Sequence, residues 1–133
     1  MLKLEIVTPE KRILDADVDS VTVPTATGEA EILPNHAPLI SALKPGILVY
    51  SVKGAADRVA VSGGFVEVNE NKVAVLADSA EKPDEVDPAM AKADRDAAEK
   101  ELAASAAAPI EETEAIREKI ESANARLQLA TVK

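Results

Sequence analysis

The sequence lacks cysteine and tryptophan, and it contains a single histidine, His36, among 133 residues. Without cysteine, the chain has no disulfide framework and no thiolate-ligated zinc or iron–sulfur site. With one histidine, it offers neither a multi-histidine metal site nor a mechanism that uses two histidines. Phe65 and Tyr50 are its two aromatic residues, so it has no stacking platform for nucleic-acid bases.

Positive charge is also scarce, because 24 acidic residues face 15 basic ones and the net charge is -9. Nucleic acids and anionic lipids are polyanions that repel an acidic protein. We therefore expect no nucleic-acid partner and no direct membrane insertion. No apolar run approaches the roughly 18 residues that span a bilayer, and residues 1–5 resemble neither a signal peptide nor a transit peptide. These features predict a soluble, cytosolic-type protein.

The composition changes near residue 84. All five glycines precede residue 65, whereas residues 85–133 contain 14 alanines in 49 positions. Valine, isoleucine and threonine together fall from 21 in residues 1–84 to 7 in residues 85–133. Glycine and β-branched residues favour turns and strands, whereas alanine with Glu, Lys, Arg and Leu favours helix. The sequence predicts a β domain at 1–84 and a helical domain at 85–133.

The β half contains several short segments with strand patterns. Residues 2–6 alternate apolar and polar side chains, as do residues 19–23, which we expect to end at Pro24. Residues 46–52 are apolar on both sides, which is typical of a central strand. Further strands are predicted at 58–62, 65–68 and 72–77. Many short strands joined by turn residues predict an all-β flattened sandwich.

The helical half predicts an antiparallel two-helix hairpin. Asp87 is a suitable N-cap and Pro88 fits the first helical position. Pro109 separates the two helices. The expected apolar stripes are thin and rich in alanine: Met90, Ala93, Ala97 and Leu102, then Ile116, Ile120, Ala123 and Leu127. Such a hairpin is marginally stable and able to detach or extend; the alternative is an ordinary surface hairpin that never moves.

Residues that could support catalysis do not form a recognisable constellation. A nucleophile would need His36 beside a serine, and no serine lies in a nucleophile-elbow motif. Glu29 and Glu31 share one face of a strand and could act as paired acids, although such pairs are more often simply solvated. Gly63-Gly64 lacks the following lysine and helix of a phosphate-binding loop. His36 lies between Pro34 and Pro38 in a stiff loop, which suits either a structural histidine or a rigid protein contact.

Residues Gly28-Glu-Ala-Glu-Ile-Leu-Pro-Asn-His-Ala-Pro-Leu39 resemble the signature of the epsilon subunit of the rotary ATP synthase. Other segments resemble further motifs of that family and occur in the same order along the chain. They are residues 7–10, 43–46, 62–68 and 75–78 and Arg126-Leu127. The family's architecture, an N-terminal β-sandwich followed by a helical hairpin, agrees with the composition. One departure is Glu31, which stands where the family usually has glycine.

The resemblance implies a central-stalk rotor subunit that is not itself an enzyme. The sandwich would bind the gamma subunit along one side and rest on the c-subunit ring, with Glu29, Glu31 and His36 at that foot. The extended hairpin would reach the catalytic beta subunits and inhibit ATP hydrolysis. Its candidate regulatory residues are Arg117, Lys119 and Arg126. Such a subunit is peripheral on the cytoplasmic face of a bacterial inner membrane, or on the stromal face of a thylakoid.

In some family members, the folded hairpin binds ATP through a motif whose counterpart here contains Asp87, Met90 and Ala91. Met90 stands where that motif has arginine, and a thioether cannot neutralise a triphosphate. Arg126 matches a phosphate-side arginine, but Ser122 stands where another would be. We therefore expect no cofactor and no ATP bound to the hairpin.

Two other function classes remain open at this point. The chain could be an unrelated β-sandwich adaptor with a helical oligomerisation arm, which co-purification with a gamma-type coiled coil would distinguish. An enzyme would require a polar pocket that the sequence does not reveal.

Overall fold

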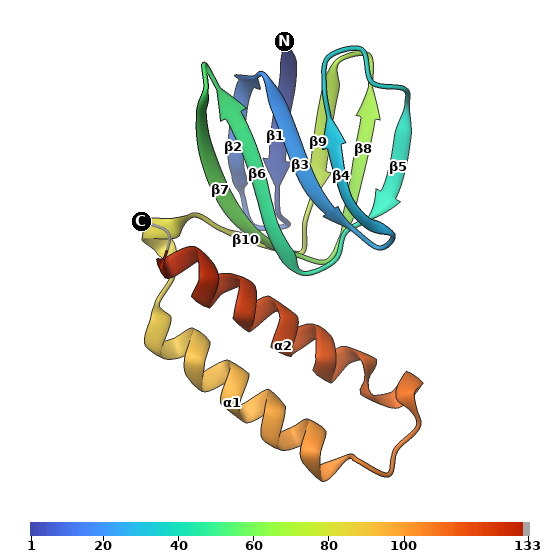
Figure 1. The fold of residues 1–133 in the computed structure, drawn as a ribbon, viewed down its shortest axis with the longest axis vertical. Coiled ribbons are helices and arrows are strands. Elements are labelled where there is room, and N and C mark those ends of the chain that lie inside the picture. The colour runs from blue at the N-terminus through green and yellow to red at the C-terminus, as the bar shows by residue number, and fades with distance from the viewer. Residues whose placement is uncertain (132–133) are drawn as a thin grey trace.

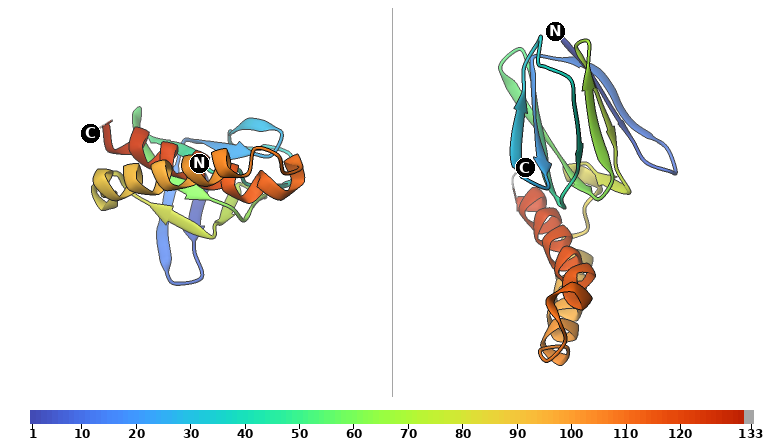
Figure 2. Two further views of the ribbon diagram at one scale, coloured as in Figure 1. Left: turned by 90° about the horizontal axis from the view of Figure 1, so that it is seen from below. Right: turned by 90° about the vertical axis from the view of Figure 1, so that its right-hand side faces the viewer.

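The computed structural model describes residues 1–131, which form a β-sandwich with a helical hairpin at one of its ends (Figure 1). Residues 132 and 133 of the predicted hairpin lie outside the described residues. The hairpin extends from one end of the sandwich, and the N-terminus lies at the opposite end (Figure 2). The predicted fold class, an all-β flattened sandwich followed by a two-helix hairpin, is confirmed.

Within residues 1–131, the sandwich consists of two five-stranded sheets. The first has the order β2-β1-β9-β8-β5, with β1 (Leu2–Val7), β2 (Arg12–Val18), β5 (Leu39–Ala42), β8 (Phe65–Asn69) and β9 (Lys72–Leu76). The second has the order β10-β7-β6-β3-β4, with β3 (Ser20–Thr25), β4 (Gly28–Ile32), β6 (Gly46–Val52), β7 (Ala55–Ser62) and β10 (Ser79–Glu81). β1 and β9 pair in parallel, and Lys3 lies opposite Lys72.

The core between the sheets is built by alternation along the strands. Leu2, Leu4 and Ile6 of β1 are fully buried, while Lys3 between them is exposed. The buried residues of this cluster all lie between residues 2 and 77, so the helices contribute none of them. Tyr50 of β6 packs at its margin. Partial burial, together with the nearby Asp57 carboxylate, raises the pKa of the Tyr50 phenol.

Two details of the predicted strands need correction. Pro24 does not end β3, because the strand continues to Thr25. The pairing of β3 with β6 stops at Thr22, and the Pro24 carbonyl, on the same strand edge, accepts a hydrogen bond from the Lys44 N–H. No strand partner therefore needs the N–H that proline lacks. The sequence patterns also missed β2, β5 and β10, which are short or interrupt their alternation, whereas the strand expected around Glu29 and Glu31 is β4.

The hairpin consists of α1 (Pro88–Ala104) and α2 (Ile110–Thr131), preceded by a short 3-10 helix, η1 (Pro83–Glu85). The Asp87 carboxylate accepts hydrogen bonds from the N–H groups of Ala89 and Met90 at 3.0 and 3.2 Å. Asp87 is therefore the N-cap of α1, as predicted.

The predicted apolar stripe of α1 was wrong. Ala91 and Ala98 are buried, whereas Met90 is 57% exposed and Ala93 and Ala97 are also exposed. Alanine occurs on every side of this helix, so the apolar pattern does not fix which side faces its neighbour. In α2, the predicted Ile116 and Ala123 are buried, whereas Ile120 and Leu127 are partly exposed.

α2 lies between the sandwich and α1, and its C-terminal part contacts β6 and β7 (Figure 1). The apolar part of this contact is a small cluster separate from the main core: Ala60, Val86 and Leu129, with Ile47 and Ala130 partly buried beside them. The hairpin is thus attached through one end of one helix. Its small apolar contact contrasts with the extensive core inside the sandwich.

Candidate interaction surfaces and the hairpin groove

Large apolar side chains gather on the outer face of the first sheet. Phe65 lies opposite Ala42 on one neighbouring strand and opposite Leu76 on the other. Ile40 is two residues from Ala42 on β5 and therefore shares its face. Ile40, Phe65 and Leu76 are 73%, 58% and 52% exposed. We call Ile40, Ala42, Phe65 and Leu76 the β5–β8–β9 patch, an apolar surface on the outer face of the first sheet.

The loop containing His36 lies at the end of the sandwich remote from the helices, between β4 and β5 (Figure 1). Its His36 Nδ1 lies 2.6 Å from the Ala37 carbonyl oxygen. Asn35 adopts a left-handed conformation with φ of 67°, and its N–H donates to the Asn71 Oδ1 at 2.6 Å. This bond ties the loop to the β8–β9 turn, so the whole end forms one connected surface.

The three residues predicted at the foot of the sandwich do not cluster. Glu29 and Glu31 are both exposed on β4. Glu29 is next to Gly28 and pairs with Pro24, which places it near the helix end of the sandwich, away from His36. Glu31 pairs with Thr22 in the regular ladder, so the backbone at this position accepts glutamate in place of the family's usual glycine.

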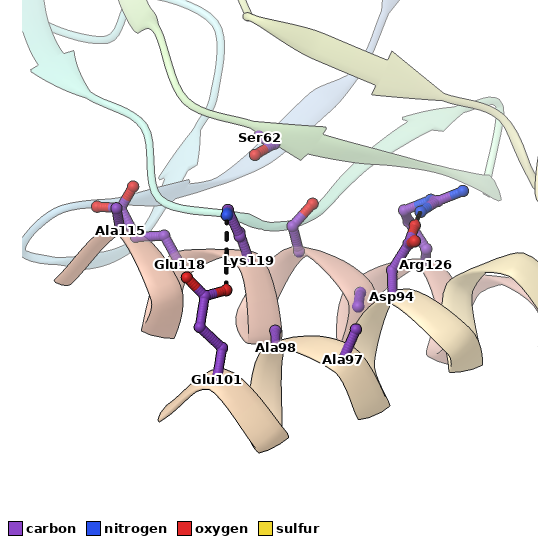
Figure 3. Close-up of a pocket in the computed structure, with 11 residues that line it drawn as sticks. Ser62, Asp94, Ala97, Ala98, Glu101, Ala115, Glu118, Lys119 and Arg126 are labelled. Carbon is purple, nitrogen blue, oxygen red and sulfur yellow. Dashed lines mark hydrogen bonds and ion pairs between the residues drawn. The ribbon is translucent and has the colours of Figure 1, made fainter. Parts of the chain in front are cut away.

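A groove of about 510 Å³ runs between the two helices and the end of β7 (Figure 3). Its lining is mostly alanine and charged residues: Ser62, Asp94, Ala97, Ala98, Glu101, Ala115, Glu118, Lys119, Ser122, Ala123 and Arg126. Three carboxylates and two basic groups therefore line it. The negative balance disfavours an anionic ligand such as a nucleotide.

The basic residues predicted to be regulatory all have partners within the molecule. Arg126 Nε lies 2.7 Å from Glu81 Oε1 on β10, and its Nη1 lies 3.1 Å from Asp94 Oδ2 on α1. Lys119 Nζ lies 3.9 Å from Glu101 Oε2, as Figure 3 shows. The Arg117 Nη2 donates to the Ile110 carbonyl oxygen at 2.8 Å. In this docked arrangement, these side chains are committed to their own hairpin and to β10.

The residues that match the family's ATP motif have structural roles or point into solvent in this fold. The Asp87 carboxylate caps α1, and Ala91 is fully buried. Met90 projects into solvent, and Ser122 lines the groove. The Arg126 guanidinium, which the resemblance assigns to a phosphate, already faces two carboxylates.

Residues 1–131 show neither a membrane-spanning helix nor a cluster of metal ligands. No helix there is long and apolar enough to cross a membrane. No group of three or more histidine and carboxylate side chains in that range is placed to hold a metal ion.

Comparison with known proteins identifies the family. The family model for the ATP synthase delta/epsilon chain β-sandwich domain matches residues 1–83. The chain belongs to this family. Being of the epsilon type, it is a non-catalytic ATP synthase subunit, as the sequence predicted.

Individual epsilon chains are similar over most of their length. The ATP synthase epsilon chain of Desulfitobacterium hafniense (strain Y51) is 48% identical over 99 residues, which is 74% of this chain and 75% of that one. The epsilon chain of Nitratidesulfovibrio vulgaris (strain DP4) is 44% identical over 128 residues, or 96% of this chain and 87% of that one. The second match includes the hairpin.

Solved ATP synthase structures contain chains of the same shape. A chain in the Euglena gracilis mitochondrial ATP synthase, described as OSCP/F1/c-ring, superposes with a TM-score of 0.73 and 25% identity over 99% of this chain and 81% of that chain. A chain in the Tetrahymena thermophila central stalk and c-ring gives a TM-score of 0.54 at 22% identity, over 63% and 68%. The latter match supports the epsilon-type fold alone.

Sequence patterns could have revealed part of the β5–β8–β9 patch but not the ion pairs of Arg126. In the Phe65-Val-Glu-Val68 segment, alternation places Phe65 on the same side as the charged Glu67, which already indicates an exposed aromatic ring. Arg126 and Asp94 are 32 residues apart. Their pairing depends on how the two helices pack, which no local pattern in either helix specifies.

Proposed function

We propose that this chain is a central-stalk rotor subunit that couples proton flow through the c-ring to ATP synthesis. The observation that carries the proposal is the similarity to a bacterial epsilon chain over 96% of the sequence, sandwich and hairpin together. The resemblance between this fold and a chain from an assembly that includes F1 and the c-ring supports the same role. The subunit would be peripheral on the cytoplasmic face of a bacterial inner membrane, or on the stromal face of a thylakoid.

The β5–β8–β9 patch is the surface that we assign to the gamma subunit. Burial of apolar area gives about 25 cal/mol per Å², so covering three large exposed side chains is a substantial source of affinity. The patch lies on a sheet whose other face packs into the sandwich core. Close-packed interiors deform little under load, which suits a subunit that transmits torque.

The loop at residues 33–38 is the part that we assign to the c-ring. It lies at the end opposite the hairpin, and the Asn35–Asn71 hydrogen bond holds it in place. His36 belongs to this end, whereas Glu29 lies nearer the other end and is a poorer candidate for the same contact.

The hairpin is the inhibitory part of the proposal. Arg117, Lys119 and Arg126 would approach the beta subunits when the hairpin extends, and all three must first leave the partners described above. Exposed ion pairs contribute little, about 0–1 kcal/mol each. We therefore expect inhibition of ATP hydrolysis to be partial and mainly steric.

Binding to gamma tests the proposal most directly. Phe65→Asp and Leu76→Asp place charge in the patch without disturbing the core, because both side chains are largely exposed. We expect the double variant to lose at least ten-fold in affinity for gamma in a quantitative pull-down. The matched control is Ile110→Asp, which changes another exposed apolar side chain at the far end of the hairpin and should bind normally.

Two outcomes would contradict this assignment. Normal gamma binding by the double variant would show that the gamma interface lies on another face of the sandwich. Failure of the unmodified chain to bind gamma would favour the alternative function, a sandwich adaptor with a helical oligomerisation arm.

A further inference from the structure

Arg126 lies where three parts of the molecule meet. It belongs to α2, and its guanidinium contacts Glu81 on β10 and Asp94 on α1 at 2.7 and 3.1 Å. Its side chain is 17% exposed and that of Glu81 is 30% exposed, whereas Asp94 at 58% is as exposed as the carboxylates of the other ion pairs within the hairpin. Partial burial reduces solvent screening and makes the Arg126–Glu81 pair stronger than an ordinary surface pair.

Other contacts between the helices and the sandwich are few. The apolar cluster around Leu129 is small and includes two alanines. Two further ion pairs, Lys44–Glu121 at 4.0 Å and Lys11–Glu85 at 3.7 Å, join exposed side chains and should contribute little. Among the described contacts, the Arg126–Glu81 pair is therefore the strongest polar link between α2 and the sandwich.

The geometry makes this link cooperative. The guanidinium is planar and rigid, its Nη1 donates a hydrogen bond to Asp94, and its Nε forms an ion pair with Glu81 without hydrogen-bond geometry. Both contacts therefore hold only when each carboxylate is correctly placed. The Asp94 contact requires the two helices to be packed together. The Glu81 contact requires α2 to be docked on the end of β10. The structure assigns Arg126 the role of a latch that holds the hairpin closed and docked at the same time.

This latch works without a nucleotide. Its counter-charges are carboxylates of the same chain, so its strength depends on ionic strength rather than on ATP. The inference concerns the isolated subunit and does not depend on the proposed role in ATP synthase.

The absence of cysteine allows a direct measurement of docking. Ala37→Cys in the remote loop and Ala106→Cys beyond α1 introduce two exposed labelling sites for fluorescence energy transfer. In this labelled background, Arg126→Ala should increase the undocked fraction roughly ten-fold, which corresponds to 1.4 kcal/mol. The undocked fraction of Arg126→Lys should lie between those of the unmodified chain and Arg126→Ala, because an ammonium keeps the charge but lacks the planar array of donors.

Lys119→Ala is the matched control. It removes an ion pair between the two helices on the same groove but touches no sandwich residue. We expect it to leave the energy transfer unchanged. Raising the salt concentration should undock the unmodified chain and have little further effect on Arg126→Ala.

A charge exchange separates the latch from a general loss of stability. Arg126→Glu alone places a third carboxylate beside Glu81 and Asp94 and should undock the hairpin strongly. Combining it with Glu81→Arg restores opposite charges between α2 and β10, while the carboxylate at position 126 still faces Asp94, so the pair should recover part of the docked population. Equal effects of Arg126→Ala and Lys119→Ala, or no recovery in the exchanged pair, would overturn the proposal. Circular dichroism of each variant confirms that the sandwich remains folded.

Discussion

At the scale of single residues, Gly64 gives the clearest stability prediction. Its φ is +90°, and an added Cβ would overlap the carbonyl oxygen of Leu76 on the adjacent strand. Gly54 also has a positive φ, of +82°, but an added Cβ there meets no atom within 4 Å. Gly64→Ala should therefore lower the free energy of unfolding by about 3 kcal/mol or more, measured by urea denaturation.

The matched substitution Gly54→Ala isolates the steric part of this effect. It carries the left-handed backbone penalty of roughly 1–2 kcal/mol but no clash. Equal losses at the two positions would mean that β8 and β9 separate easily enough to accommodate a methyl group.

Arg126 also bears on nucleotide binding. Because its guanidinium is paired with Glu81 and Asp94, and Met90 supplies no charge, we expect negligible ATP affinity in the isolated subunit. Isothermal titration calorimetry should show no binding tighter than about 1 mM. A micromolar affinity, about -8 kcal/mol, would contradict this expectation. Asp94→Ala serves as a comparison, because it removes one competing carboxylate.

At the scale of the elements, the sandwich should fold without the hairpin. The buried residues of its main core all precede residue 78, and removing the helices exposes chiefly Ile47 and Ala60 of the small cluster. A chain ending at residue 84 should show a β-type circular dichroism spectrum and a single cooperative urea transition. An unfolded spectrum would mean that the Leu129 cluster is required for folding.

The elements also show how far the sequence determines the fold. The change from β-branched to alanine-rich composition correctly predicted the sandwich and the hairpin, and Asp87 correctly marked the start of α1. The strand β2 was missed because Ile13 and Leu14 are adjacent apolar residues that interrupt the alternation, and β1–β2 pairing is irregular at Ile6 and Val7. The sequence did not determine which face of α1 packs against α2, because alanine occurs on all sides of this helix and no side is clearly the most apolar.

Long-range contacts account for what the sequence could not predict about the site. The four-residue β5–β8–β9 patch depends on the register of three strands. Phe65 is the one member whose exposure the local sequence pattern predicts. Arg126, which the resemblance assigns to a partner, is paired with two carboxylates of its own chain in the docked arrangement. The family resemblance supplied the functional class, whereas side-chain partners required the packed structure.

At the scale of the whole molecule, the hairpin should slow ATP hydrolysis by the assembled enzyme. A complex lacking residues 85–133 should hydrolyse ATP faster than the unmodified complex, as measured by phosphate release. Arg117→Ala combined with Lys119→Ala should activate less than this truncation, because we expect steric blocking to dominate. Equal activation would show that charge carries the inhibition, and unchanged activity after truncation would remove the inhibitory role.

Arg126 is best excluded from that comparison. Its substitution would remove the proposed contact with the beta subunit and would also release the latch, and the two effects oppose each other. Arg126→Ala alone should therefore activate less than Arg117→Ala with Lys119→Ala, and it should inhibit further if latch release dominates.

The parallel pairing of β1 with β9 has a consequence for the order of folding during biosynthesis. β1 lies inside its sheet, between β2 and β9, and residues 3–7 pair with residues 72–76. During synthesis, β1 therefore leaves the ribosome long before β9, its second neighbour in the sheet, has been made. Closing such distant contacts costs chain entropy and slows folding.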